Sequence, residues 1–278
     1  MKHFLPVIAI LGFLYLAVGS CSKKGGSSPV TPPVDTTPVA ILPYKLVWSD
    51  EFDTGSVPDP KKWTYDIGGN GWGNSESQYY TNRPENARIE NGNLVIEARK
   101  EAYQGSAYTS ARLLTKTRAA WTYGRFEIRA KLPSGRGTWP AIWMLSDHDP
   151  LSWPSDGEMD IMEEVGFDPN VIHATIHCKQ YFGGNGKGFA TTVPTAQDSF
   201  HVYKLEWTSS QADFYVDDNK YFSYFNGGNG PATWPYYNDF FMILNIAVGG
   251  TWGGTKGIDD SVFPQKMLVD YVRVYQRK

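Results

Sequence analysis

Hydrophobic and polar residues alternate along several short runs of this chain. In Gly124–Lys131, the apolar residues Phe126, Ile128 and Ala130 share one face, and the charged residues between them share the other. A repeat of two residues is typical of a β-strand with one buried face. Similar runs, rich in β-branched or aromatic residues, are Asn93–Arg99, His201–Trp207 and Met267–Tyr275. We predict a strand for each of them.

The rest of the pattern favours an all-β fold. The run Phe214–Phe222 predicts a hairpin that turns at Asp218 and Asn219, two residue types that tolerate a positive φ. No long stretch shows the period of an amphipathic helix, and neither a phosphate-binding glycine motif nor an internal repeat is found. Many short strands in one domain of this size indicate a β-sandwich or jelly roll.

Composition narrows the classes of function. The chain has 278 residues, of which 41% are apolar and 15% aromatic, including 10 Trp. This suffices for one large core and excludes a wholly disordered or fibrous chain. A net charge of −3 argues against a nucleic-acid partner, and two cysteines exclude a disulfide framework and a cysteine-rich zinc module. Exposed tryptophans are used in carbohydrate binding, so a sugar-active protein is a hypothesis to test.

The first 43 residues differ from the rest. Their basic start precedes 15 apolar residues, Phe4–Val18, which suit a secretory signal and are too few to span a membrane. The small residues before Cys21 resemble the cleavage box of bacterial lipoproteins, in which that cysteine is lipidated. An ordinary signal with an incidental cysteine is the alternative. We predict a signal peptide over residues 1–20, a lipidated Cys21 with a Pro/Ser/Thr-rich tether over residues 21–43, and one domain over residues 44–278 in which Cys178 is buried.

The densest chemistry lies in the segment Gly157–Val165, which reads GEMDIMEEV. On a strand, Glu158 and Asp160 project from one face, whereas strict alternation turns Glu163 toward the apolar side. A buried, unpaired carboxylate is unfavourable. One extra residue, a β-bulge at Ile161–Met162, would bring Glu163 onto the face of the other two acids. We therefore expect three carboxyl groups in a row on one open face.

Such a row suits acid–base chemistry. Like charges this close cannot all ionise, so the pKa of at least one carboxyl must rise. A retaining glycosidase needs this arrangement, because one carboxylate attacks the anomeric carbon while the other starts protonated. The alternatives are a solvated acidic strand and a Ca²⁺ site, although calcium ligands usually lie along a turn with Asn and Gly.

The acid segment resembles the E-x-D-x-x-E signature of glycoside hydrolase family 16, in the bulged form of bacterial laminarinases, which are endo-β-1,3-glucanases. Further segments look like blocks of this family in the family's order and extend over Tyr44 to Gln276. They are Tyr44–Asp53, Gly71–Tyr80, Tyr108–Leu113, Gly135–Met144 and Ile243–Gly250. The resemblance implies a concanavalin-like β-jelly-roll sandwich of two antiparallel sheets, with a substrate groove on the concave face.

The resemblance also assigns roles to the acids. Glu158 would be the nucleophile and Glu163 the acid/base, with Asp160 between them to tune the nucleophile through a hydrogen bond. These roles agree with the chemistry expected from the residues themselves. Glu164 matches no catalytic position, and we expect it to be a surface charge at the strand end. Catalysis is expected to need no cofactor.

Several residues around the acid segment are candidates for substrate binding. Trp139 and Trp143 fall on one face of Thr138–Leu145, where their indoles could stack on sugar rings or, alternatively, lie in the core. The resemblance favours the substrate and adds further positions. These are Asn74 and Arg112 on the non-reducing side, Trp153 near the scissile bond, His177 near the leaving group and Trp252 as a wall of the cleft. A surface salt bridge is the alternative for Arg112.

Two metal sites come into question. His173 and His177 are four residues apart on one strand face and could bind zinc, but neither a HExxH helix nor a third ligand accompanies them. The resemblance implies a separate, structural Ca²⁺ far from the cleft, unless the carboxylates at the matching positions simply cap turns. Those positions are Glu51, the Gly92 carbonyl and Asp270.

Together these points predict a secreted bacterial enzyme that cleaves internal β-1,3 bonds of laminarin-like glucans with retention of configuration. We expect a monomer at the periplasm or cell surface, held at the membrane only by its lipid, with a polysaccharide and no nucleic acid as its partner. One alternative is the same chemistry on mixed-linkage β-1,3-1,4-glucan or on a galactan. Another is a non-catalytic β-glucan-binding protein on the same scaffold, which the presence of all three acids disfavours.

Overall fold

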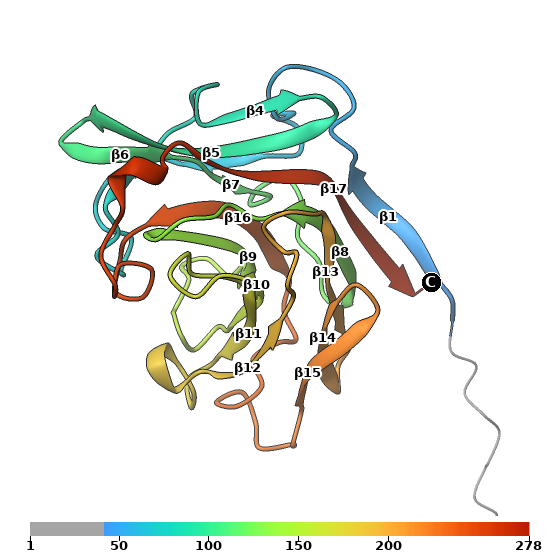
Figure 1. The fold of residues 1–278 in the computed structure, drawn as a ribbon. Helices are drawn as coiled ribbons and strands as arrows, with labels where there is room; N and C mark the ends of the chain where they lie inside the picture. Colours follow the sequence, from blue (N-terminus) through green and yellow to red (C-terminus); the bar gives the residue numbers. More distant parts are fainter. Residues whose placement is uncertain (1–41, 278) are drawn as a thin grey trace, which may run out of the picture. The chain divides into compact units, whose positions relative to one another are not determined.

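A computed structural model describes residues 42–277, which form two β-sheets packed against each other (Figure 1). The predicted signal peptide, Cys21 and residues 22–41 of the tether lie outside the described residues. Helical structure in residues 42–277 is limited to two 3₁₀ turns, η1 (Gly183–Asn185) and η2 (Asp260–Val262), and no helix there is long and apolar enough to cross a membrane. The predicted all-β jelly-roll sandwich is confirmed.

The larger sheet has ten strands, and all its neighbouring strands are antiparallel except β3 and β6. Its hydrogen-bonded order is β15 (Asn219–Phe225), β14 (Gln211–Val216), β13 (His201–Trp207), β8 (Gly124–Lys131), β17 (Gln265–Arg277), β5 (Asn93–Tyr103), β6 (Ser106–Ser110) and β3 (Gln78–Tyr80). In addition, β1 (Tyr44–Asp50) pairs with β17 and β4 (Ala87–Glu90) pairs with β5.

The smaller sheet has seven strands and carries the acid segment. Its order is β12 (Lys187–Thr192), β11 (Val171–His177), β10 (Glu158–Glu163), β9 (Thr138–Ser146), β16 (Phe240–Val248), β7 (Arg112–Leu114) and β2 (Thr64–Asp66). The acid strand β10 lies inside this sheet, between β9 and β11. Both neighbours therefore hold it in place by backbone hydrogen bonds.

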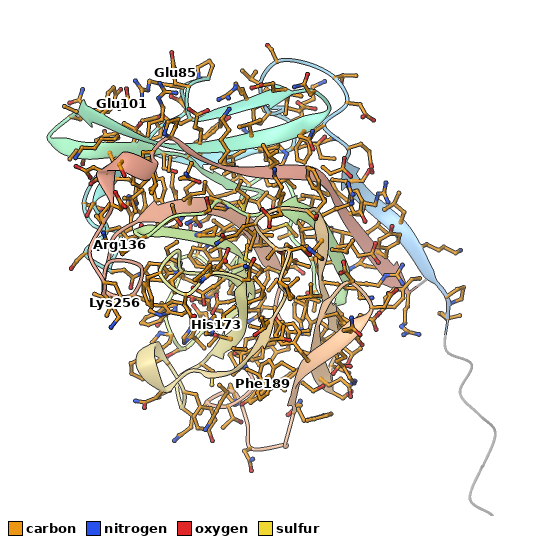
Figure 2. All side chains as sticks on the ribbon, viewed as in Figure 1. Glu85, Glu101, Arg136, His173, Phe189 and Lys256 are labelled. Atoms are coloured by element: carbon orange, nitrogen blue, oxygen red, sulfur yellow. The ribbon has the colours of Figure 1, made fainter. Side chains whose placement is uncertain are left out.

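The core fills the layer between the two sheets (Figure 2). Strand β8 alternates as predicted, with Phe126 and Ile128 fully buried. The two sheets meet where Trp207 of β13 packs edge-on against Phe240 of β16, with ring centroids 5.3 Å apart. Burying aromatic side chains of this size supplies much of the energy that holds the layers together, at about 25 cal/mol per Å² of apolar surface. Cys178 is buried as predicted.

The predicted hairpin forms, but its turn is displaced by one residue. The turn consists of Asp217 and Asp218, because Asn219 already pairs with Val216. Asp217 adopts a positive φ of 54°. Three consecutive turn-forming residues stand here, so residue type alone does not choose which two of them form the loop.

Candidate active site

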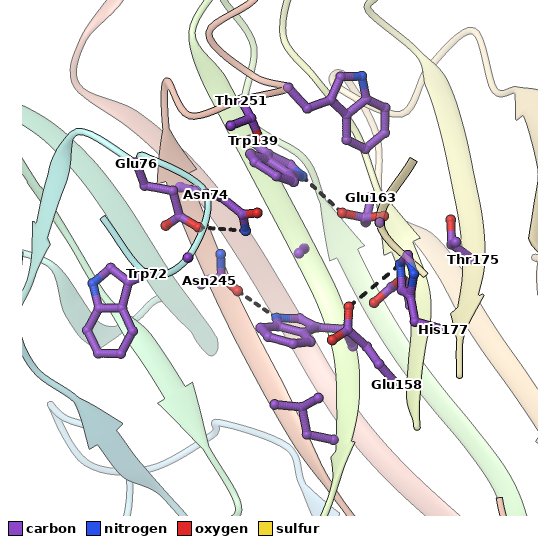
Figure 3. A pocket seen from close by; sticks show the side chains of 18 of the residues that line it. Trp72, Asn74, Glu76, Trp139, Glu158, Glu163, Thr175, His177, Asn245 and Thr251 are labelled. Atoms are coloured by element: carbon purple, nitrogen blue, oxygen red, sulfur yellow. Dashed lines mark hydrogen bonds and ion pairs between the residues drawn. The ribbon is translucent and has the colours of Figure 1, made fainter. Parts of the chain in front are cut away.

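A cleft of about 720 Å³ lies on the face of the seven-stranded sheet that points away from the core (Figure 3). Strands β7, β16, β9, β10 and β11 contribute its floor, and loop residues such as Trp72, Trp153 and Trp252 contribute its walls. All three candidate catalytic acids and all seven candidate substrate-binding residues line this cleft. The structure therefore brings together residues that are far apart in the sequence.

Strand β10 contains the predicted bulge. Asp160 and Met162 face consecutive residues of β9, which leaves Ile161 as an extra residue, and the register with β11 also shifts between Asp160 and Glu163. Ile161 and Met162 are both fully buried. Because two successive side chains enter the core, Glu163 returns to the cleft face beside Glu158 and Asp160.

Glu158 is held by three neighbours. The indole Nε1 of Trp153 donates a hydrogen bond of 2.7 Å to Glu158 Oε2. The Asp160 carboxyl group is close enough to raise the pKa of Glu158 through its charge. Nε2 of His177 lies 3.1 Å from Asp160 Oδ2 and 3.7 Å from Glu158 Oε1 (Figure 3). These contacts fix the direction in which Glu158 points into the cleft.

Glu163 lies at the other end of the acid row and has an indole donor of its own. Trp139 Nε1 donates to Glu163 Oε1 at 3.0 Å (Figure 3). The Trp139 ring packs edge-on against Trp252 at 5.6 Å, and Trp252 packs in the same way against His173 at 4.9 Å. The wall of the cleft thus orients the residue that holds Glu163.

Burial dominates the electrostatics of the acids. It raises the pKa of Glu158 to about 8 and that of Glu163 to about 7, and it raises the pKa of Asp160 well above its ordinary value. Repulsion from the neighbouring carboxylates adds to each rise, whereas the Trp153 and Trp139 hydrogen bonds lower the pKa of their partners. The row therefore retains protons up to neutral pH, as expected for like charges placed side by side.

The prediction that Glu164 is a surface charge is wrong. Its side chain is fully buried, on the opposite side of the strand from the cleft. Oε1 accepts hydrogen bonds from the Asn170 backbone N–H at 2.6 Å and from Gln197 Nε2 at 2.8 Å, whereas Oε2 has no partner. Burial raises the pKa of Glu164 to about 7. The sequence does not reveal that Glu164 is buried, because residues 170 and 197 cover its side chain only in the folded chain.

Arg112 closes the end of the cleft that is far from the acids. Its guanidinium lies over the Trp143 ring at 4.7 Å and over the Trp72 ring at 5.1 Å. It also pairs with Asp66 at 3.0 Å. Arg112 therefore lines the cleft and also forms a salt bridge, whereas its hydrogen bond to a sugar stays a prediction.

Sequence reasoning missed several residues that line the cleft. These are Trp72, Glu76, Thr175, Asn245 and Thr251. A signal existed for Asn245, since it is the one polar residue in the buried strand FFMILNIAV. Trp72 and Glu76 stand in the segment Gly71–Tyr80, which the resemblance had already singled out.

The structure separates the two histidines considered for zinc. In residues 42–277, the group of acidic and histidine side chains close enough to share a cation is Glu158, Asp160 and His177. His173 is not part of this group and packs against Trp252 instead. Two of the three grouped residues belong to the acid row and His177 contacts it, so the arrangement favours catalysis over a dedicated zinc site.

The candidate calcium ligands are engaged with arginines. Both oxygens of Glu51 accept hydrogen bonds from Arg273, the shortest at 2.7 Å, and Asp270 accepts one from Arg129 at 2.7 Å. Each candidate carboxylate is paired with a guanidinium group, and these pairs would have to break before both carboxylates could bind one Ca²⁺. A calcium site involving these residues and the Gly92 carbonyl stays a prediction from the sequence.

Comparisons with known proteins agree with this geometry. Residues 74–273 match the family model described as glycosyl hydrolases family 16. The chain is 55% identical over 244 residues to a beta-glucanase from Rhodothermus marinus, which covers 84% of this chain and 85% of the relative. The crystal structure of the laminarinase from Rhodothermus marinus has a TM-score of 0.83 and 54% identity, covering 85% of this chain and 99% of that one.

A second solved structure shows a sugar bound to a similar protein. It is a non-specific endo-β-1,3(4)-glucanase from family 16 with a 1,3-β-D-cellobiosyl-glucose at its active site. Its TM-score is 0.82 at 48% identity, covering 86% of this chain and 98% of that one. The chain studied here belongs to glycosyl hydrolase family 16.

Proposed function

We propose that this protein is a retaining endo-glycosidase that hydrolyses internal β-1,3-glucosidic bonds of laminarin-like glucans. The observation that carries the proposal is the bulge in β10, which places Glu158 and Glu163 on one face of a long cleft. A retaining glycosidase needs two carboxyl groups that are close together and flank the scissile bond. The similarity to a laminarinase and to an endo-β-1,3(4)-glucanase supports β-glucan as the substrate.

In the first step, Glu158 attacks the anomeric carbon while Glu163 gives its proton to the departing glycosidic oxygen. The bond from carbon to that oxygen breaks, and a glycosyl ester forms on Glu158. Glu158 must be an anion for this step. Burial and the charge of Asp160 raise the pKa of Glu158 to about 8, whereas His177 and the Trp153 N–H at 2.7 Å act in the opposite direction and stabilise the Glu158 anion.

In the second step, Glu163 accepts a proton from a water molecule whose oxygen attacks the same carbon. The ester bond breaks, and Glu158 is released as a carboxylate. Burial raises the pKa of Glu163 to about 7, so part of the protein still carries a proton on Glu163 near neutral pH. The Trp139 N–H at 3.0 Å stabilises the Glu163 anion after that proton has gone. Glu163 can therefore act as an acid and then as a base near neutral pH.

The extent of the cleft favours internal bonds over chain ends. Its floor crosses five strands, from Arg112 on β7 to His177 on β11. Adjacent strands are about 4.8 Å apart, so the floor is about 19 Å across, enough for several sugar rings. Trp139 and Trp143 offer indole faces along this path, on which the C–H faces of sugars can stack.

Measuring new reducing ends tests the proposal. The protein and its Glu158→Gln variant are incubated with laminarin, mixed-linkage β-1,3-1,4-glucan and agarose, with the exposed Glu85→Gln as the matched control. We expect activity on laminarin that Glu158→Gln abolishes and Glu85→Gln retains. Activity only on another polymer would show that laminarin-like glucans are not the substrate. Binding without hydrolysis would indicate a glucan-binding protein.

We also propose that the enzyme is exported and held at a bacterial membrane by a lipid on Cys21. The support is the sequence alone, namely the apolar run Phe4–Val18, the small residues before Cys21 and the Pro-rich segment that follows. Such a tether would let a monomeric domain reach an insoluble or bulky polysaccharide. In cells fed a labelled fatty acid, the wild-type protein should carry the label and Cys21→Ser should not. Gel filtration of the domain tests the monomer.

A further inference from the structure

Trp143 is held on two sides in the floor of the cleft. Its indole Nε1 donates a hydrogen bond of 2.8 Å to Asn245 Oδ1, and the guanidinium of Arg112 lies over its ring at 4.7 Å. An indole used as a stacking surface must keep its plane while sugars slide and dissociate. The hydrogen bond to Asn245 fixes the plane of the Trp143 ring. The residues that orient Asn245 therefore also affect how a sugar stacks on that ring.

A buried chain of hydrogen bonds orients Asn245. Its Nδ2 donates to the Tyr80 hydroxyl oxygen at 3.1 Å, and the Tyr80 hydroxyl donates to Glu76 Oε2 at 3.2 Å. At its other oxygen, Glu76 accepts from Asn74 Nδ2 at 3.3 Å (Figure 3). We call the three residues Glu76, Tyr80 and Asn245 the Glu76 relay. It joins Asn74 on one wall of the cleft to Trp143 in its floor.

The direction of every bond in the Glu76 relay is determined. An indole N–H can only donate, so Asn245 must present its oxygen to Trp143 and its NH₂ to Tyr80. The single Tyr80 proton is then left for Glu76, whose carboxylate can only accept. Gln78 Nε2 donates to the same Glu76 oxygen at 2.7 Å, so no free position for a proton remains there. The chain of donors ends on one anion.

The pKa of Glu76 is raised, because burial outweighs the hydrogen bonds from Gln78, Asn74 and Tyr80 and the nearby charge of Arg112. Those three donors nevertheless all point their hydrogens at its carboxylate oxygens. Tyr80 is fully buried and does not line the cleft, so it can influence a sugar only through its neighbours.

We propose that the Glu76 relay positions Trp143 and Asn74 for the sugar that binds in the part of the cleft next to Arg112, which makes Glu76 and Tyr80 positioning residues. This inference deepens the proposed function and rests on it. A positioning role predicts weaker glucan binding when the relay is broken, with the chemistry at Glu158 and Glu163 left in place.

Tyr80→Phe is the sharpest test, because it removes one hydroxyl that no substrate touches. Tyr203→Phe is the matched control, since Tyr203 is equally buried and its hydroxyl has no hydrogen-bond partner in residues 42–277. Steady-state kinetics on laminarin should show KM raised about 3–10-fold in Tyr80→Phe, as expected for the loss of one hydrogen bond, with kcat within about threefold of wild type. Tyr203→Phe should leave KM unchanged.

Glu76→Gln tests the end of the chain. Its amide must present an NH₂ either to Asn74 or to Tyr80 and Gln78, all of which donate at present. KM should again rise, and the Glu76→Gln/Tyr80→Phe double variant should be no worse than the poorer single variant, because both break one relay. Isothermal titration of laminarihexaose into the same variants carrying Glu158→Gln measures binding without hydrolysis and should show the same loss.

The outcomes separate the two claims. A lowered Tm with unchanged KM and unchanged affinity in Tyr80→Phe would give Tyr80 a purely structural role and overturn the inference, while the proposed function stands. Additive losses in the double variant would also overturn it. A wild-type protein that neither cleaves nor binds any β-1,3-glucan would overturn the proposed function, and the inference with it. If Glu76→Gln does not fold, Tyr80→Phe and Trp143→Phe decide the question.

Discussion

Glu164 allows a stability measurement whose sign follows from its surroundings. Burial raises its pKa from 4.5 to about 7 in the folded protein. Between these two pH values the folded protein keeps a proton that the unfolded chain has released. The stability contributed by a neutral, buried Glu164 is therefore fully present below about pH 4.5 and is lost as the pH rises through about 7.

Replacing Glu164 with glutamine should remove this loss. Glutamine resembles the protonated acid, because its oxygen can still accept from Asn170 and Gln197 while the charge is gone. Since one pKa unit corresponds to about 1.4 kcal/mol, the rise from 4.5 to about 7 sets an upper bound of about 3 kcal/mol. Local relaxation reduces this value. We expect Glu164→Gln to raise the free energy of unfolding by about 1–3 kcal/mol at pH 8 and to change it little at pH 5.

Thermal unfolding of both proteins between pH 5 and pH 8 measures this difference. For a domain of this size, about 1 kcal/mol shifts Tm by about 2–4 °C, so the variant should unfold about 2–12 °C higher at pH 8. Glu85→Gln, at an exposed carboxylate, should shift Tm little at either pH. Glu164→Ala should lower Tm at both, because it leaves two buried donors without an acceptor. An equal effect of Glu164→Gln at pH 5 and pH 8, or a lower Tm at pH 8, would refute the reasoning.

Three further predictions concern the acids and the metal. Trp139→Phe removes the donor that lowers the pKa of Glu163, so the alkaline limb of kcat/KM should move to higher pH by up to about one unit, whereas the exposed Glu85→Gln, outside the cleft, should leave the limb in place. Asp160→Asn removes a negative neighbour of Glu158, whose pKa should fall; the acidic limb of the pH profile should move to lower pH, and an unmoved limb would contradict this. Treatment with a chelator should change neither Tm nor laminarin hydrolysis, because arginines already pair with the carboxylates of the calcium candidates; a lowered Tm that Ca²⁺ restores would count against that arrangement.

The features that the sequence predicts well are those that depend on neighbouring residues. Alternation along Gly124–Lys131 predicts strand β8 with its observed bounds, because the two faces of a strand meet different surroundings. The bulge in β10 follows from a local conflict, since strict alternation would bury Glu163 unpaired. The extra residue, Ile161, resolves this conflict by turning Glu163 to the cleft face, where it completes the acid row.

What escaped prediction depends on contacts between distant segments. Glu164 is buried by residues 170 and 197, which come near it only in the folded chain. Likewise, Glu76 and Tyr80 reach Asn245 across 165 positions or more. No periodicity within one strand records such contacts. The turn at Asp217 was displaced for a simpler reason, because adjacent residues there have nearly equal turn preferences.

Trapping the covalent intermediate tests the central claim most directly. A 2-deoxy-2-fluoro-β-laminaribiosyl fluoride has a good leaving group, and its fluorine at carbon 2 slows the release of the sugar from the enzyme. After digestion, mass spectrometry should find the laminaribiosyl adduct on the peptide that contains Glu158, attached to that residue. An adduct on Glu163, or turnover of laminarin with inversion and no adduct, would contradict the account.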